Sequence, residues 1–349
     1  MPVAVASHSF PKHHALRQEL TARYPNAVFN ETGQPLRGAD LVRFLRGHDK
    51  AITGLEVLDA ALFAAVPEVR VVSKYGVGLD MIDLEAARRG GVSVRWTPGV
   101  NRQSVAELTI AFMIALCRRI VPLATDLREG RWGRGGGRQL SSATVGIVGC
   151  GHVGKTVAQL CRAFGSTVLA HDIVDYAEFY REHAVRPVAL DVLLHDADIV
   201  TVHVPLDSST RNIIDAPRLE LMKPTAFLIN AARGGIVDER ALTAALAERR
   251  LAGAAADVFS VEPPIDHELL RQPTFLGTPH IGASTEEAVL AMGRAAIAGL
   301  DLEHGSLEWA GFVGLHADAA LEDLRETLER AAAEDEVRVG RGAEGFDDV

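Results

Sequence analysis

Residues 145–154 read V-G-I-V-G-C-G-H-V-G, and this stretch decides the fold of the chain. A short apolar run, typical of a buried parallel strand, leads into Gly149, Gly151 and Gly154, spaced as G-x-G-x-x-G. Apolar residues then recur at helical spacing over 153–160. In such a strand–turn–helix the first glycine permits the tight turn, the second admits a pyrophosphate, and the third lets the helix approach the sheet. The stretch therefore predicts the start of a dinucleotide-binding domain.

An acidic residue follows the next expected strand of this domain. That strand covers residues 167–170, and Asp172 comes roughly twenty residues after the glycines, where a carboxylate binds the ribose hydroxyls of a dinucleotide. The following residues, Ile173, Val174 and Asp175, include no cation for a 2′-phosphate. We therefore expect NAD, rather than NADP, as the cofactor.

Composition narrows the class of protein. The chain has 349 residues, enough for two domains, and a net charge of −10, which argues against general binding to nucleic acid or an anionic membrane. Its three cysteines form no C-x-x-C pair and read as buried free thiols. No signal peptide, membrane span or metal site is expected. The composition predicts a cytoplasmic protein that binds neither nucleic acid nor a membrane.

The first hundred residues predict an α/β domain. Short apolar runs at 3–6, 27–29, 51–53, 70–73 and 92–95 alternate with amphipathic stretches, which indicates a parallel sheet with helices on its faces. The conspicuous turn S-K-Y-G-V-G comes at the end of the fourth run, where open α/β sheets bind ligands. Backbone N–H groups freed by its glycines could cradle a carboxylate, although a plain glycine turn fits this stretch equally well. The candidate substrate residues in this turn are Lys74, Tyr75, Gly76, Val77 and Gly78.

The order of elements predicts that one domain is inserted in the other. A helix is expected over 104–120, with Ser104 as its N-cap and Glu107 completing a capping box. The Gly- and Arg-rich segment 131–138 is interpreted as a loop rather than an RNA-binding segment, because it is short and the chain is acidic. An Ala-rich helix over 284–305 should run back to the first domain. We therefore expect a substrate domain at 1–98 and 288–316, an NAD-binding domain at 99–287, and a helical, partly disordered tail at 317–349.

Three ionisable residues follow expected strands of the NAD-binding domain: Arg233, Glu262 and His280. Each alone could be an ordinary surface group, but the carboxyl ends of parallel strands meet at one edge of a sheet. Oxidation of a secondary alcohol needs a base with a pKa near neutrality, which suits His280. A carboxylate, Glu262, would orient it, and the planar guanidinium of Arg233 would hold a substrate carboxylate.

Several motifs together resemble one family. K-Y-G-V-G-L-D-M-I-D, V-G-I-V-G-C-G-H-V-G-K, I-N-A-A-R-G-G-I-V-D-E, A-A-D-V-F-S-V-E-P-P and T-P-H-I-G-A-S-T are similar to motifs of the D-isomer-specific 2-hydroxyacid dehydrogenases, in particular of the 3-phosphoglycerate dehydrogenase branch. The resemblance implies a flavodoxin-like and a Rossmann-like domain, an NAD-dependent reaction and a homodimer. It supports Arg233, Glu262 and His280 as catalytic residues. It implies contacts with the cofactor for His152, Val153, Asp172, Val204, Pro205, Ala231, Ala232, Asp257, Gly282 and Ala283, besides the three glycines.

Two departures leave the substrate open. His152 stands where the family often has an arginine, and residues 53–56 read T-G-L-E where phosphoglycerate enzymes carry cations. Lys74 and Arg134 remain as possible partners for a phosphate. Alternative substrates are hydroxypyruvate, glyoxylate or a phosphonate-bearing hydroxy acid. An alternative of another class is an NAD-sensing protein similar to the C-terminal-binding-protein corepressors.

Overall fold

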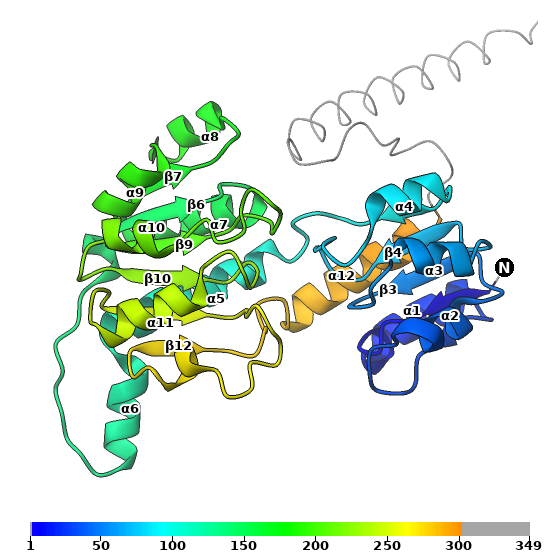
Figure 1. Cartoon of the computed structure of the whole chain (residues 1–349), viewed down its shortest axis with the longest axis horizontal. Coiled ribbons are helices and arrows are strands. Elements are labelled where there is room, and N and C mark those ends of the chain that lie inside the picture. Colours follow the sequence, from blue (N-terminus) through cyan, green and yellow to red (C-terminus); the bar gives the residue numbers. More distant parts are fainter. Residues whose placement is uncertain (1, 302–349) are drawn as a thin grey trace, which may run out of the picture. The chain divides into compact units, whose positions relative to one another are not determined.

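The structure, a computed structural model, describes residues 2–301 and contains two all-parallel sheets (Figure 1). The first sheet has the strand order β2-β1-β3-β4-β5, which is the flavodoxin-like order of a doubly wound fold. The predicted α/β class is therefore confirmed for this part of the chain. Its strands are β1 (Val3–Val5), β2 (Val28–Phe29), β3 (Lys50–Thr53), β4 (Val71–Lys74) and β5 (Ser93–Arg95).

Apolar residues of this sheet pack on both of its faces, since one buried cluster contains Ala4, Ala51 and Val72 and another contains Val3 and Ile52. This pattern follows from alternation along buried parallel strands. The helices between the strands are η1 (Phe10–Lys12), α1 (His14–Arg23), α2 (Gly38–Leu45), α3 (Ala60–Ala65) and α4 (Leu84–Arg89).

The second sheet has the order β12-β11-β10-β9-β6-β7-β8. The direction of winding reverses between β9 and β6, and ligands of open α/β sheets bind beyond the carboxyl ends of the strands at such a point. Its strands are β6 (Thr144–Val148), β7 (Thr167–His171), β8 (Val185–Pro187), β9 (Ile199–Val202), β10 (Phe227–Asn230), β11 (Gly253–Ala256) and β12 (Phe275–Gly277).

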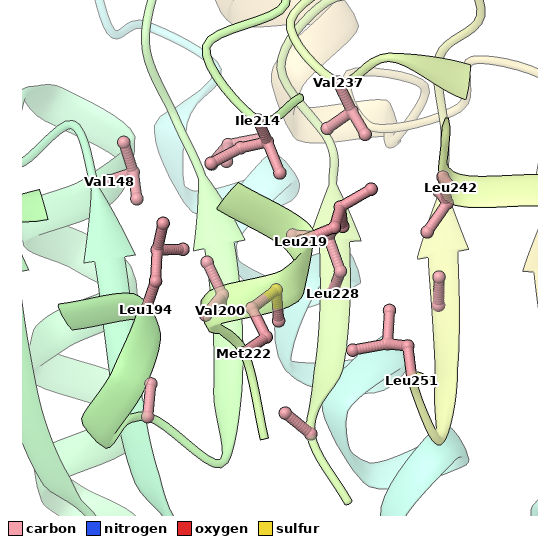
Figure 2. Close-up of a cluster of buried hydrophobic side chains, with 14 of the residues drawn as sticks. Val148, Leu194, Val200, Ile214, Leu219, Met222, Leu228, Val237, Leu242 and Leu251 are labelled. Carbon is pink, nitrogen blue, oxygen red and sulfur yellow. The ribbon is translucent and has the colours of Figure 1, made fainter. Parts of the chain in front are cut away.

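Helices bury both faces of this sheet. On one face, Leu194, Leu219 and Met222 lie over the strands that carry Val200 and Leu228 (Figure 2). A second buried cluster, which includes residues of α5 and α7, covers the other face and contains the buried cysteines Cys117, Cys150 and Cys161. The elements are α5 (Arg102–Arg118), α6 (Ile120–Arg128), η2 (Leu140–Ser142), α7 (His152–Phe164), α8 (Ala177–Glu182), α9 (Leu190–Asp196), α10 (Ala216–Leu221), α11 (Glu239–Ala247) and η3 (Glu268–Arg271).

The chain returns to the first sheet after β12. Helix α12 (Glu286–Gly299) packs beside β4, where Ser73 Oγ donates to the carbonyl of Ala296 at 2.7 Å (Figure 1). The seven-stranded part is therefore inserted between the first sheet and its last helix, as predicted. The proposed domain bounds stay predictions, and the expected tail at 317–349 lies outside the described residues.

The start and end of α5 differ from expectation. Its N-cap is Asn101, and Ser104 Oγ instead donates to the carbonyl of Gly282 at 2.5 Å, so the predicted Ser104–Glu107 capping box is wrong. Arg119 adopts a positive φ of 51°, which ends α5 and starts the separate helix α6. Within residues 2–301 no single helix is long and apolar enough to cross a membrane; α5 and α6, bent by 63°, pass that test together by length and composition alone.

Candidate active site

The three glycines of the G-x-G-x-x-G motif meet three different steric requirements. Gly149 has a φ of +93°, and a Cβ there would lie 2.7 Å from the carbonyl carbon of His203. A Cβ on Gly154 would overlap the carbonyl oxygen of Gly149, so the first turn of α7 is as close to the strand as backbone allows. Gly151, by contrast, faces open space, with nothing within 4 Å of its would-be Cβ. A backbone that is open at the second glycine and leads into a 13-residue helix fits the pyrophosphate of NAD.

Asp172 lies beside this loop, just beyond β7. Its Oδ2 accepts a hydrogen bond from the backbone N–H of Cys150 at 2.6 Å. The carboxylate therefore supports the glycine loop and stands at the end of the strand where the sequence predicts a ribose contact. Its role toward the ribose stays a prediction.

The three predicted catalytic residues follow adjacent strands on the other side of the switch point. Arg233 follows β10, Glu262 follows β11 and His280 follows β12. Since these strands are neighbours in the sheet and run parallel, their carboxyl ends bring the three side chains to one edge.

His280 and Glu262 form a hydrogen-bonded pair. His280 Nδ1 lies 2.8 Å from Glu262 Oε2, while Glu262 Oε1 accepts from the N–H of Phe259 at 3.0 Å. The hydrogen bond with Glu262 raises the pKa of His280, although burial opposes this. Burial would raise the pKa of Glu262, but the hydrogen bonds from His280 and Phe259 outweigh it and leave that pKa lowered. The pair therefore favours imidazolium beside a carboxylate.

Asp257 holds the loop that carries His280. The carboxylate of this buried residue accepts from the N–H groups of Ile281 and Gly282, at 2.8 and 2.7 Å, and from the hydroxyl of Thr278 at 2.5 Å. His280 itself has a positive φ of 55°, and its N–H donates to the carbonyl of Asp257 at 2.8 Å. Sequence reasoning placed Asp257 along the cofactor and missed this structural task, for which the strand-end aspartate was the only signal.

Arg233 is held by contacts that sequence reasoning missed. Its Nε donates to Asp80 Oδ1 at 3.1 Å, and its Nη1 donates to the carbonyl of Ala232 at 2.8 Å. A Cβ on Gly78 would overlap Nη2, so only glycine leaves room for the guanidinium at that point. The side chain is thereby placed against the glycine turn that follows β4.

Lys74 lies beneath the same turn. Its ammonium donates to the carbonyl of Gly54, and Nζ lies 4.0 Å from the would-be Cβ of Gly76. The residue is 5% exposed, and this burial lowers the pKa of Lys74 to about 8, although the nearby carboxylates of Glu56 and Asp80 oppose the shift. The turn therefore has a cation beside each of its glycines, Lys74 near Gly76 and Arg233 near Gly78.

Glu56 is turned inward. Its side chain is 1% exposed, Oε2 accepts from the N–H of Gly54 at 2.6 Å, and Oε1 is buried without a hydrogen-bond partner. The loop after β3 thus closes on its own carboxylate. A phosphate near Lys74 would meet a buried negative charge close behind it.

Arg134 is not brought to this edge within the chain. Its loop lies against the C-terminal end of α5, where the N–H of Arg138 donates to the carbonyl of Cys117 at 2.9 Å. The other end of α5 contacts Gly282 through Ser104, about 20 Å away at 1.5 Å per residue.

The other predicted cofactor residues do lie beyond strand ends of the second sheet: Val204 and Pro205 after β9, Ala231 and Ala232 after β10, and Gly282 and Ala283 after β12. Within residues 2–301 no group of three His, Cys, Asp or Glu side chains is placed to hold a metal ion.

The sequence of this chain is similar to those of known proteins. The NAD binding domain of the D-isomer specific 2-hydroxyacid dehydrogenases matches residues 110–282. A hydroxypyruvate reductase from Thermotoga maritima is 38% identical over 239 residues, which cover 67% of this chain and 77% of that protein. The chain belongs to the D-isomer specific 2-hydroxyacid dehydrogenase family. It carries that family's NAD binding domain. The 3-phosphoglycerate dehydrogenase branch, which the sequence motifs resemble, is also matched: a D-3-phosphoglycerate dehydrogenase from Methanocaldococcus jannaschii is 41% identical over 229 residues, which cover 65% of this chain.

A solved structure has a similar fold over most of this chain. The crystal structure of the TT0316 protein from Thermus thermophilus superposes with a TM-score of 0.74 at 33% identity and covers 86% of this chain and 94% of that one. The match to the Methanocaldococcus phosphoglycerate dehydrogenase, however, spans only 44% of that protein's length.

Proposed function

We propose that this protein is an NAD-dependent D-2-hydroxyacid dehydrogenase in which His280 is the acid/base. The observation that carries the proposal is the His280–Glu262 pair, 2.8 Å apart, at the sheet edge where Arg233 reaches the glycine turn. NAD, when bound, accepts or returns the hydride. The glycine motif and Asp172 would hold it, together with the residues at the ends of β9, β10 and β12 named above.

Each residue of the chain then has a defined task. The substrate carboxylate accepts from backbone N–H groups at Gly76–Gly78 and from Arg233, which fixes the reacting carbon. Glu262 holds the Nδ1–H of neutral His280, so that Nε2 takes the hydroxyl proton as the carbon–oxygen double bond forms. In the reverse direction Nε2 of the imidazolium returns this proton to the carbonyl oxygen. Lys74 adds positive charge beneath the turn.

The buried Glu56 favours an unphosphorylated acid. Besides Arg233, which holds the carboxylate, Lys74 is a cation near this turn, and it shares the loop at Gly54 with the buried carboxylate of Glu56. We therefore propose that 3-phosphoglycerate is a poor substrate, and that a small 2-oxo acid such as hydroxypyruvate or glyoxylate is reduced more efficiently. Curated relatives with both types of name match this chain. A homodimer acting in the cytoplasm stays a prediction.

Turnover of a substrate panel tests this function. We would measure kcat/KM with NAD+ or NADH for glycerate and hydroxypyruvate, glycolate and glyoxylate, lactate and pyruvate, and 3-phosphoglycerate, with L-isomers as controls. We expect D-specific turnover that is highest for the small unphosphorylated acids. NADH binding without turnover of any 2-hydroxy or 2-oxo acid would instead support the corepressor-like alternative.

The anion site has its own test. If 3-phosphoglycerate is turned over, Lys74→Ala should raise its KM strongly. Arg134→Ala is the matched control, because Arg134 is exposed and its loop contacts the C-terminal end of α5 through Arg138. Efficient turnover that Lys74→Ala does not impair would refute this account.

A further inference from the structure

Glu239 collects three hydrogen bonds from the segment that carries Glu262. It is the first residue of α11, and its side chain is 13% exposed. Its Oε1 accepts from the N–H and the hydroxyl of Ser260, at 2.7 and 2.8 Å, and its Oε2 accepts from His267 Nε2 at 2.9 Å. No step of the proposed reaction uses Glu239 directly.

The segment that it binds has no apolar anchor of its own. Between the buried side chains of Phe259 and Leu269, which are 6% and 1% exposed, no side chain is buried. Val261 and Ile265 are 69% and 79% exposed. The middle of this segment is therefore held by polar contacts rather than by packing, and those contacts converge on Glu239.

The hydrogen-bond pattern requires a carboxylate at this position. His267 Nδ1 accepts from the N–H of Leu269 at 3.3 Å, so the imidazole proton sits on Nε2 and is donated to Glu239. Ser260 donates twice to the other oxygen. All three partners are thus donors, and an amide in place of Glu239 would turn an N–H₂ group toward one of them.

The contacts between Glu239 and Ser260 lie next to the hydrogen-bonded pair of Glu262 and His280. Ser260 is two residues before Glu262, which itself folds back to accept from the N–H of Phe259 at 3.0 Å. A Cβ on Gly234 would overlap the carbonyl of Phe259, so the start of the segment is also fixed. Loss of the contacts at Ser260 would leave Glu262 on an exposed segment anchored mainly at its two ends.

We propose that Glu239 is a positioning residue, which fixes the 259–268 segment so that Glu262 stays in hydrogen-bonding register with His280. This inference rests on the proposed function of the His280–Glu262 pair. Glu239 touches neither substrate nor cofactor in this scheme and acts through Glu262 alone.

The test compares Glu239→Ala with Glu248→Ala. Glu248 is the matched control, because it is an exposed carboxylate at the C-terminal end of the same helix and pairs with Arg250 at 2.9 Å. The imidazole of His280 would be titrated by NMR in ligand-free protein, alongside kcat, KM, NADH affinity and thermal unfolding. We expect Glu239→Ala to lower the pKa of His280 and to reduce kcat roughly tenfold, the scale of a sub-ångström misalignment, with NADH affinity and KM little changed. The control should change none of these.

A double-mutant cycle with Glu262→Gln separates positioning from general loosening. If Glu239 acts through Glu262, Glu239→Ala should add almost nothing to the kcat loss in a Glu262→Gln background. Full additivity would overturn the inference, as would an unchanged His280 titration in folded Glu239→Ala. If Glu239→Ala does not fold, Ser260→Ala should lower the pKa of His280 and kcat in the same direction by a smaller amount. A Ser260→Ala protein in which neither quantity changes would overturn the inference. A Glu262→Gln protein with an unaltered His280 titration would instead count against the proposed proton path itself.

Discussion

Gly78 tests how tightly Arg233 is held against the carboxylate turn. In Gly78→Ala the new Cβ would lie 2.7 Å from Asp80 Oδ1 and 3.0 Å from Arg233 Cζ, and it would overlap Nη2. Ordinary contacts of a Cβ are 3.4–4 Å, so Nη2 of the guanidinium must retreat by more than an ångström. A misplacement of this size in a positioning group costs on the order of 100-fold in catalysis. We expect kcat/KM for the best substrate to fall by about that factor.

The backbone at Gly78 has no positive φ, so the substitution should not strain the fold. Steady-state kinetics with NADH would be measured beside thermal unfolding, and Gly133→Ala is the control because its Cβ would meet nothing within 4 Å. In an Arg233→Lys background, which keeps the charge but loses the planar fork, Gly78→Ala should add little. Wild-type kcat and KM in Gly78→Ala would refute the placement of Arg233 in the substrate site.

Three further predictions concern the proton path, the cofactor and pH. His280→Ala should lower kcat at least about 100-fold while NADH binding, followed by fluorescence, stays intact; near-normal turnover would remove His280 from the reaction. Asp172→Ala should weaken the preference for NADH over NADPH in the same binding assay, and equal affinities in the wild type would contradict our choice of cofactor. Because burial lowers the pKa of Lys74 to about 8, its ammonium loses a proton above that pH, so KM for an anionic substrate should rise above pH 8. In Lys74→Met that rise should disappear and KM should be high throughout; a wild-type KM that stays flat well above pH 8 would argue against this role.

The fold class, and the sheet edge at which the site lies, could be predicted from the amino-acid sequence alone. Alternating apolar runs and amphipathic stretches predict two parallel sheets, because buried parallel strands are apolar on both faces and need helices to join them. The spacing of Gly149, Gly151 and Gly154 predicts a strand–turn–helix that only glycine permits, and each glycine has the expected geometry. Since parallel strands end at one edge, residues after strands could be assigned to one site without coordinates.

The side chains that support the site, by contrast, are identified by the folded structure and not by the sequence. The contact between Asp80 and Arg233 joins residues 153 positions apart, and the contact between Glu239 and Ser260 joins residues 21 positions apart. No local periodicity encodes such pairs, because they depend on how loops from different strands pack. Ser104 shows the same limit. Its spacing from Glu107 fits a helix cap, but the helix begins earlier, with Asn101 as its N-cap. The Ser104 hydroxyl therefore lies inside the helix, where it donates to the carbonyl of Gly282 instead.

The direction in which Glu56 points was likewise beyond the sequence. The letters T-G-L-E at 53–56 show that a carboxylate replaces the expected cations, but not whether it faces solvent. In the structure its carboxylate accepts from the N–H of Gly54 and is 1% exposed, while the ammonium of Lys74 donates to the carbonyl of the same Gly54. Composition and spacing thus determine the fold and the chemistry available at one edge of a sheet, whereas the charge that a substrate meets there depends on loop conformations that only the packed chain fixes.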